Sequence, residues 1–328
     1  MIHLFIFILS CKNDVVNAGA LNASSGNKIH AAAVCYIMEL SCEMIVFKEV
    51  RAMKTPVAAL IYDFDKTLCT KDMQEYGFIP SLGMTAEEFW REVNALTDRE
   101  QMDNILAYMY LMVEKSRERA LPVTRKTFER LGAGVEFFPG VMSWFERISR
   151  FGADRGVDIQ HYIVSSGIRE IIEGTPIAAH FKKIYACEFM YGADGAIRWP
   201  KFAVNYTAKT QFLFRINKGV LDIDSHSAVR LNQFTPENER PVPFANMIYI
   251  GDGLTDVPCM KLVKSHGGQS IAVYDPAQGD SLARSLRHDN RVNFIAPADY
   301  EAGEPLERVV QAIIEKIRAV SAMEALEQ

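Results

Sequence analysis

The stretch VAALIYDFDKT at residues 57–67 decides the interpretation of this sequence. Its first six residues form a short, largely apolar run that ends abruptly at Asp63. Such a run predicts a buried parallel strand whose carboxyl end opens on a site. Ligands of open α/β sheets bind at that edge. We therefore expect the acidic residues that follow the strand to be functional.

The two carboxylates of this stretch belong to Asp63 and Asp65. Alternate residues of an extended segment lie on the same face, so both side chains can converge on one point. Two close carboxylates repel each other unless a cation or a proton compensates them. Mg²⁺, a hard ion that prefers oxygen ligands, is the natural counter-charge. Alone, the pair is as typical of a surface turn as of a site, so further residues are needed.

Other apolar runs predict more strands, and helical patterns separate them. Strands that alternate with helices are typical of a doubly wound parallel sheet, which gives an α/β fold class. The Asp194-Gly195 pair predicts a hairpin turn, and the polar, proline-containing stretch Asp222–Pro243 predicts an irregular insertion. The predicted strands are Ile159–Val164, Ala186–Met190, a segment from Ile197, Met247–Ile250 and Ser270–Tyr274; the predicted helices are Val141–Arg150, Lys209–Leu221 and Leu306–Val320.

Residues 70–135 predict an all-helical block that interrupts the sheet after its first strand. Thr85 and Thr124 are suited to cap two of its helices, and the second of these should end near Gly132. A further helix is expected to begin at Asp98. This divides the chain into a core domain of residues 53–69 and 136–328 and a helical domain of residues 70–135.

Residues 1–52 lack a steady period and contain the polar stretch NASSGN at 22–27. We expect them to be an N-terminal extension that is disordered or not native, with Met53 as the natural start. The apolar run at residues 4–9 is too short to span a bilayer, and no Lys or Arg precedes it, as one would in a signal peptide.

Three further elements follow predicted strands or begin predicted helices. Residues 251–256 read GDGLTD, where glycines allow close backbone approach and Asp252 and Asp256 add carboxylates. Ser165-Ser166-Gly167 offers a hydroxyl and N–H groups that could hold a phosphate oxygen. Lys209 could neutralise phosphate or carboxylate charge, and Lys218 is its alternative. Each element alone is equally consistent with a turn, a helix cap or a solvated lysine.

Together and in this order, the four elements resemble the haloacid dehalogenase superfamily of phosphohydrolases. The resemblance covers about residues 56–275 and is nearest to the phosphoserine-phosphatase-like branch, on the segment IVSSGI at 163–168, the predicted hairpin and the segment AKT at 208–210. It implies a Rossmann-like core with an inserted helical cap. In that superfamily a second aspartate, here Asp65, distinguishes phosphate transfer from dehalogenation.

The resemblance also implies a role for each site residue. Asp63 would be the nucleophile that forms an aspartyl-phosphate, and Asp65 the general acid and base. Asp252 would ligate Mg²⁺ with Asp63 and the backbone carbonyl of Asp65, and Asp256 would ligate the ion or orient a water bound to it. The residues implied to bind phosphate or support the phosphate loop are Ser165, Ser166, Gly167, Lys209 and Thr67.

Two residues depart from the pattern of that branch. Lys66 adds a positive charge directly after Asp65. Asp72 stands where phosphoserine phosphatases have a cap glutamate that reads the substrate amine, and an aspartate reaches less far. The substrate therefore does not follow from the resemblance.

Composition narrows the remaining function classes. The 328 residues are 49% hydrophobic and 23% charged, with a net charge of −5, which is typical of a soluble globular protein. Nucleic-acid binding usually needs a basic face, so neither nucleic acid nor membrane is an expected partner. The six cysteines form no CxxC pair, which favours a reducing, cytoplasmic location.

The sequence therefore predicts a Mg²⁺-dependent phosphatase that hydrolyses a small phosphorylated metabolite, with bulky substrates excluded by the cap. Two alternatives stay open: a phosphotransferase that passes phosphate to an acceptor other than water, and a catalytically inactive binding protein that has kept the fold.

Overall fold

The computed structural model describes residues 55–326, and β1 (Val57–Tyr62) lies inside its sheet. On one side β1 pairs in parallel with β2 (Asp158–Ile168), and on the other side with β5 (Met247–Gly251). Its last five residues are fully buried, as an apolar run between two layers of helices should be. The predictions made for residues 1–52 lie outside the described residues.

The sheet of the described region has seven strands in the order β4-β3-β2-β1-β5-β6-β7. Only β4 runs antiparallel, as the second strand of the hairpin predicted at Asp194-Gly195. This confirms the predicted doubly wound α/β fold. The short strand β7 was not predicted, because its four residues include a proline. The remaining strands are β3 (Phe181–Tyr191), β4 (Ile197–Phe202), β6 (Gln269–Tyr274) and β7 (Phe294–Pro297).

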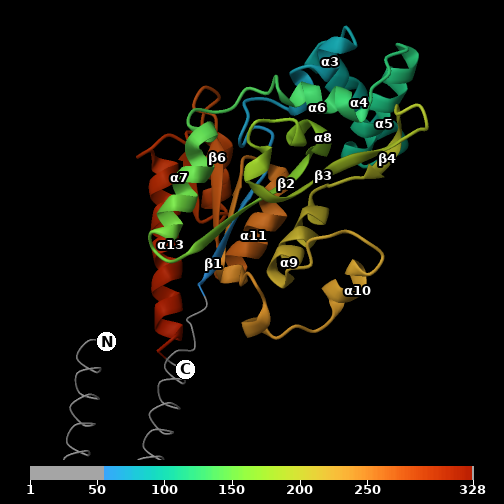
Figure 1. Cartoon of the computed structure of the whole chain (residues 1–328). Coiled ribbons are helices and arrows are strands. Elements are labelled where there is room, and N and C mark those ends of the chain that lie inside the picture. Colours follow the sequence, from blue (N-terminus) through green and yellow to red (C-terminus); the bar gives the residue numbers. More distant parts are fainter. Residues whose placement is uncertain (1–54, 327–328) are drawn as a thin grey trace, which may run out of the picture. The chain divides into compact units, whose positions relative to one another are not determined.

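Helices cover both faces of the sheet. The chain moves from β1 to β2 in one direction and from β5 to β6 in the other, so right-handed crossovers place the connecting helices on opposite faces. One layer contains α7 (Val141–Ala153) and α13 (Pro305–Glu324), which lie side by side in Figure 1. The other contains α9 (Thr210–Lys218), α11 (Val257–Ser265) and α12 (Ser281–His288).

The segment between β1 and α7 forms the expected helical block. Thr85 and Thr124 each cap a helix through their hydroxyl oxygens. The predicted start at Asp98 is wrong: Asp98 lies inside a helix, and the next helix begins after Asp103, whose carboxylate accepts the Leu106 N–H at 3.0 Å. The helices of this block are α3 (Phe78–Ser81), α4 (Ala86–Glu100), α5 (Asn104–Glu118) and α6 (Arg125–Gly132).

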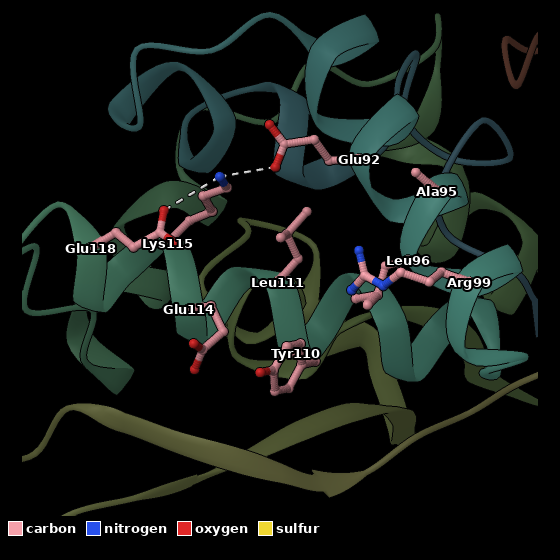
Figure 2. A pocket seen from close by; sticks show the side chains of 9 residues that line it. All are labelled: Glu92, Ala95, Leu96, Arg99, Tyr110, Leu111, Glu114, Lys115 and Glu118. Atoms are coloured by element: carbon pink, nitrogen blue, oxygen red, sulfur yellow. Dashed lines mark ion pairs between the residues drawn. The ribbon is translucent and has the colours of Figure 1, made fainter.

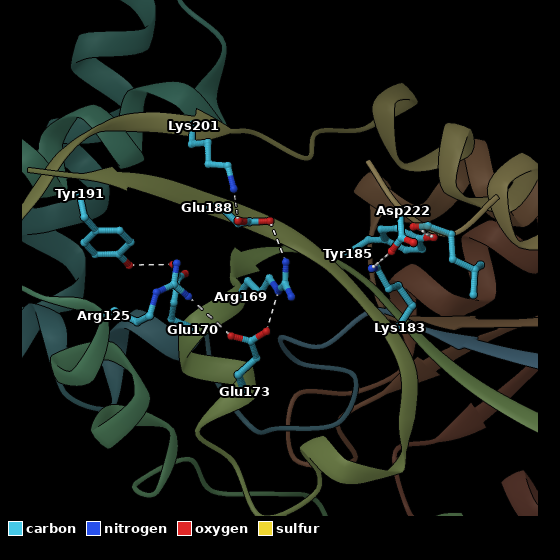
Figure 3. Close-up of polar contacts among 11 residues, drawn as sticks. Arg125, Arg169, Glu170, Glu173, Lys183, Tyr185, Glu188, Tyr191, Lys201 and Asp222 are labelled. Carbon is cyan, nitrogen blue, oxygen red and sulfur yellow. Dashed lines mark hydrogen bonds and ion pairs between the residues drawn. The ribbon is translucent and has the colours of Figure 1, made fainter. Parts of the chain in front are cut away.

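Packing and ion pairs join the helical block to the sheet. Helix α5 packs against β4, and α6 packs against α8 (Arg169–Glu173). Figure 3 shows Arg125 of α6 beside the buried carboxylate of Glu170, at 3.1 Å, which also accepts a hydrogen bond from Tyr191 at 2.7 Å. The described residues belong to one compact unit, and their division into a core and a cap domain stays a prediction.

The stretch Asp222–Pro243 is largely irregular, as predicted, although it contains the short helix α10 (Ser227–Asn232). The buried Arg215 of α9 organises its start by donating to the carbonyl of Asp222 at 2.8 Å. Among the helices of residues 55–326, none is both long and apolar enough to cross a membrane.

Candidate active site

The nucleophile candidate Asp63 directly continues β1. Its N–H donates to the carbonyl of Ile250 at 2.9 Å, so pairing with β5 extends past the end of the strand. Its side chain is only 9% exposed. Asp65 is held differently: its Oδ1 accepts the backbone N–H of Met73 at 2.9 Å, from the start of the helical block.

Three carboxylates gather at this edge of the sheet. One oxygen each from Asp63, Asp252 and Asp256 lies within 4.8 Å of the other two. Asp252 and Asp256 belong to the GDGLTD loop after β5, the strand next to β1. The carboxylate of Asp65 is not part of this group. A set of oxygen donors that repel one another fits a hard divalent cation.

Lys209 lies within this acidic group and has a side chain that is 0% exposed. Its ammonium is 3.0 Å from Oδ1 of Asp63 and 2.8 Å from Oδ1 of Asp256. The alternative, Lys218, instead donates to two backbone carbonyls of the 222–243 stretch, Leu231 at 2.8 Å and Gln233 at 2.7 Å. The structure thus brings Lys209 to the nucleophile candidate and not Lys218.

Burial and mutual repulsion raise the pKa values of the site carboxyls. Burial, then the charge of Asp256, raises the pKa of Asp63 to about 6, with Lys209 opposing the shift. Burial, then Asp256 and Asp63, raises the pKa of Asp252 to about 8. For Asp65, burial followed by the charges of Asp72 and Asp63 holds the pKa well above its ordinary value. A carboxyl with a raised pKa is suited to donate a proton near neutral pH.

These shifts predict how the stability of the metal-free protein depends on pH. Asp63 and Asp252 bind protons more tightly in the folded protein than in the unfolded chain, where the pKa is 3.8. Their contribution to stability is therefore full below about pH 4 and is lost as the pH rises through about 6 and 8. We expect the melting temperature in EDTA to fall over this range relative to an Asp252→Asn variant. Saturating Mg²⁺ should reduce the difference, and equal slopes for both proteins in EDTA would contradict the prediction.

The serine segment ends β2 at the same edge of the sheet. Ser165 is buried, and its Oγ accepts the N–H of Gly167 at 3.0 Å. That amide is therefore engaged within the loop. A Cβ on Gly167 would lie 2.9 Å from Oδ2 of Asp65 and 2.1 Å from Cε of Met73. Gly167 thus lets the loop approach Asp65 closely, while the carbonyl of Ser166 accepts the hydroxyl of Tyr108, from α5, at 2.5 Å.

Thr67 connects the loop after β1 to the loop after β5. Its hydroxyl donates to Oδ1 of Asp252 at 3.3 Å, and its carbonyl accepts the buried hydroxyl of Tyr300 at 2.8 Å. Lys66, in the left-handed region at φ 56°, turns its ammonium to within 2.6 Å of Asp72. Asp72, which the resemblance implied to stand in the place of a cap glutamate, therefore has an intramolecular cation as its partner.

Three aromatic residues of the site were not predicted: Tyr108, Tyr249 and Tyr300. Tyr249 donates to Oδ1 of Asp256 at 2.7 Å. The two-residue period of a strand places Tyr249 on the same face as Gly251, and this pattern could have indicated it. Tyr108 and Tyr300 reach the site from distant segments, and nothing local in the sequence indicates their contacts.

Two hollows are found in the described region, one beside the site and one within the helical block. One, of about 210 Å³, reaches Lys66 and Asp252 from the side of β6 and α12. The other, of about 330 Å³, lies between α4 and α5 and contains none of the site residues. Figure 2 shows that its Lys115 is already paired, with Glu92 at 2.9 Å and Glu118 at 3.4 Å.

Residues 60–261 match the family model of the haloacid dehalogenase-like hydrolases, and the chain belongs to this family. An uncharacterized protein of Borreliella burgdorferi is 31% identical over 277 residues, which cover 76% of this chain and 94% of that protein. The fold is shared with solved phosphoserine phosphatases. A substrate-bound phosphoserine phosphatase complex superimposes with a TM-score of 0.50 at 14% identity, covering 79% of this chain and 99% of the other.

A probable phosphoserine phosphatase from Vibrio cholerae, in its unliganded form, also has a TM-score of 0.50, at 12% identity, covering 82% of this chain and 67% of that chain. The resemblance drawn from the motifs is therefore confirmed for the family and for the phosphoserine-phosphatase-like fold.

Proposed function

We propose that this hydrolase is a Mg²⁺-dependent phosphatase that acts on a small phosphorylated metabolite through an aspartyl-phosphate. The observation that carries the proposal is the ammonium of Lys209, 3.0 Å from Asp63, inside a group of three carboxylates. A buried nucleophile beside a cation and a metal-type donor set is suited to a transferring phosphoryl group. The family and the phosphatase fold support it.

In the first step, a carboxylate oxygen of Asp63 attacks phosphorus, and the bond from phosphorus to the leaving oxygen breaks. Asp65 gives its proton to that oxygen, so the product leaves as a neutral alcohol. The raised pKa of Asp65 supports this role, because burial and the charges of Asp72 and Asp63 favour its protonated form. Lys209 stabilises the negative charge on the phosphoryl oxygens.

In the second step, Asp65, now ionised, takes a proton from a water molecule, whose oxygen attacks the phosphorus of the aspartyl-phosphate. The bond between phosphorus and Asp63 breaks, and inorganic phosphate is released. Asp65 is then protonated again and ready for the next substrate. Ser165 and the loop around Gly167 are proposed to contact the phosphoryl group.

Asp63, Asp252 and the backbone carbonyl of Asp65 would hold the Mg²⁺, and Asp256 would complete the acidic group. When bound, the ion offsets the repulsion between carboxylates and phosphate and polarises the phosphoryl oxygens. We propose that helices α4 to α6 act as a cap that keeps the substrate small and excludes nucleic acid and membranes, in a cytoplasmic enzyme. The contact from Tyr108 to Ser166 supports a cap that closes on the site.

The proposed function predicts metal-dependent hydrolysis of p-nitrophenyl phosphate by the full chain. EDTA should lower turnover by at least on the order of 100-fold, and added Mg²⁺ should restore it. Hydrolysis releases phosphate and nitrophenol in equal amounts, whereas a phosphotransferase releases less phosphate when an acceptor alcohol is present. Robust turnover in EDTA, or a phosphate deficit with an acceptor, would count against the proposal.

A further inference from the structure

Tyr249 places a buried phenol directly beneath the active-site carboxylates. It lies on β5, is 0% exposed, and donates its hydroxyl hydrogen to Oδ1 of Asp256 at 2.7 Å. The same oxygen accepts the ammonium of Lys209 at 2.8 Å. One oxygen of Asp256 therefore receives two donors, both from fully buried side chains.

The other contacts of Asp256 restrict it further. Its Oδ2 is 3.3 Å from the N–H of Gly253, a weak contact at the start of the next turn. A Cβ on Gly251 would lie 2.6 Å from the carboxyl carbon of Asp256. The carboxylate thus packs against bare backbone on one side and has its Oδ1 turned toward Tyr249 and Lys209. Only Oδ2 remains available to face a bound cation.

We infer that Tyr249 is a positioning residue that holds Asp256 against Lys209 and so fixes the ammonium beside Asp63. The inference rests on the proposed function, because it concerns the lysine of that reaction. Lys209 has three N–H donors; one bonds to Asp256 at 2.8 Å, and the ammonium forms an ion pair with Asp63 at 3.0 Å. With Asp256 fixed, the ammonium stays beside Asp63, where its other donors can reach a phosphoryl oxygen.

The phenol matters because Asp256 has competing partners. Its carboxylate is within 4.8 Å of those of Asp63 and Asp252, so a cation held there also attracts it. Without the Tyr249 hydroxyl, Oδ1 keeps one donor instead of two, and the side chain can turn toward the cation. Lys209 would then lose its fixed orientation. The Tyr249 hydroxyl therefore keeps the carboxylate of Asp256 oriented mainly toward Lys209.

The test removes only the hydroxyl, with Tyr249→Phe. The expected result is a loss of roughly 10- to 100-fold in kcat with p-nitrophenyl phosphate at saturating Mg²⁺, the range for losing a hydrogen bond to a charged group. Tyr162→Phe is the matched control: Tyr162 is also buried in the sheet, on β2, but its hydroxyl donates to Gln160 at 2.8 Å. The control should keep kcat within about twofold.

Binding measurements separate positioning from metal ligation. Isothermal titration calorimetry with Mg²⁺ should give the Tyr249→Phe protein an affinity equal to or higher than that of the wild type. Inorganic phosphate, titrated in the presence of Mg²⁺, should bind at least about fivefold more weakly to the variant. In a double-mutant cycle, Tyr249→Phe should add little to the loss in Asp256→Asn, because Tyr249 acts through that carboxylate.

Three outcomes would overturn the inference. One is an active wild type whose kcat and phosphate affinity do not change in Tyr249→Phe. Another is weaker Mg²⁺ binding with normal phosphate binding, which would make Tyr249 a support for a metal ligand. The third is full additivity with Asp256→Asn. A wild type without metal-dependent turnover or phosphate binding would instead refute the proposed function, and this inference with it.

Discussion

Asp63→Asn is expected to lower kcat for p-nitrophenyl phosphate by at least on the order of 10³-fold. The amide that replaces the carboxylate is not a nucleophile, so the covalent step cannot begin. The variant also removes the negative charge that lies 3.0 Å from Lys209, which disturbs the ammonium that should contact the phosphoryl oxygens. Because Asp63 is buried in a repelling group of carboxylates, the neutral variant should fold at least as stably as the wild type in EDTA.

The matched control is Asp158→Asn. Asp158 lies on β2 opposite Val57, at the amino end of the strands, where it accepts a hydrogen bond from Gln160 at 2.7 Å. It should keep wild-type turnover and stability. Steady-state kinetics and thermal unfolding of both variants provide the comparison. An Asp63→Asn protein with more than a few per cent of wild-type kcat would exclude the covalent mechanism.

Lys209→Met is expected to cause the second large effect, on both stability and activity. Methionine has a similar length and no charge, so Asp63 and Asp256 are left buried without their cation. Removing one partner of a buried ion pair typically costs about 3–5 kcal/mol, and the free energy of unfolding in EDTA should fall by about that amount. We expect kcat/KM to fall by roughly 10²- to 10³-fold, because the charge that stabilises the transition state is lost.

Lys218→Met is the control for this variant, because it removes the rival lysine. Among the described residues, the ammonium of Lys218 donates only to carbonyls of the 222–243 stretch, so kcat/KM should stay within about twofold of the wild type. Urea unfolding and steady-state kinetics measure both proteins. If Lys218→Met lost more activity than Lys209→Met, the lysine of the site would have been assigned wrongly.

The parts of the fold that could be predicted are those with a local cause. The run at 57–62 is apolar because both of its faces are covered, and the acidic residues after it lie at the open edge where strands end. The same reasoning located the GDGLTD loop at the end of β5 and the serine segment at the end of β2. The choice between Lys209 and Lys218 stayed open in the sequence: nine residues are two and a half helical turns, which places the two lysines on opposite sides of a helix without showing which side faces the site.

The parts that could not be predicted depend on contacts between distant segments. Tyr300 reaches the carbonyl of Thr67 from a loop beyond β7, and Tyr108 reaches Ser166 from α5. Gly167 reads as part of a phosphate loop, yet its lack of a side chain also makes room for Asp65. The start of α5 was missed because Asp98 and Asp103 are both plausible N-caps, and only packing selects Asp103.

The central place of β1 has a consequence for how the nascent chain folds. In the sheet, Leu60 is paired with His161 and with Ile248, so its neighbours are about 100 and about 190 residues away, which makes for high contact order and slow folding. Helices α4 to α6, with local contacts, can form during synthesis, whereas β1 must wait as an exposed apolar segment until β5 emerges. We expect this interval, rather than the finished enzyme, to be the period of greatest risk of aggregation and of greatest dependence on chaperones.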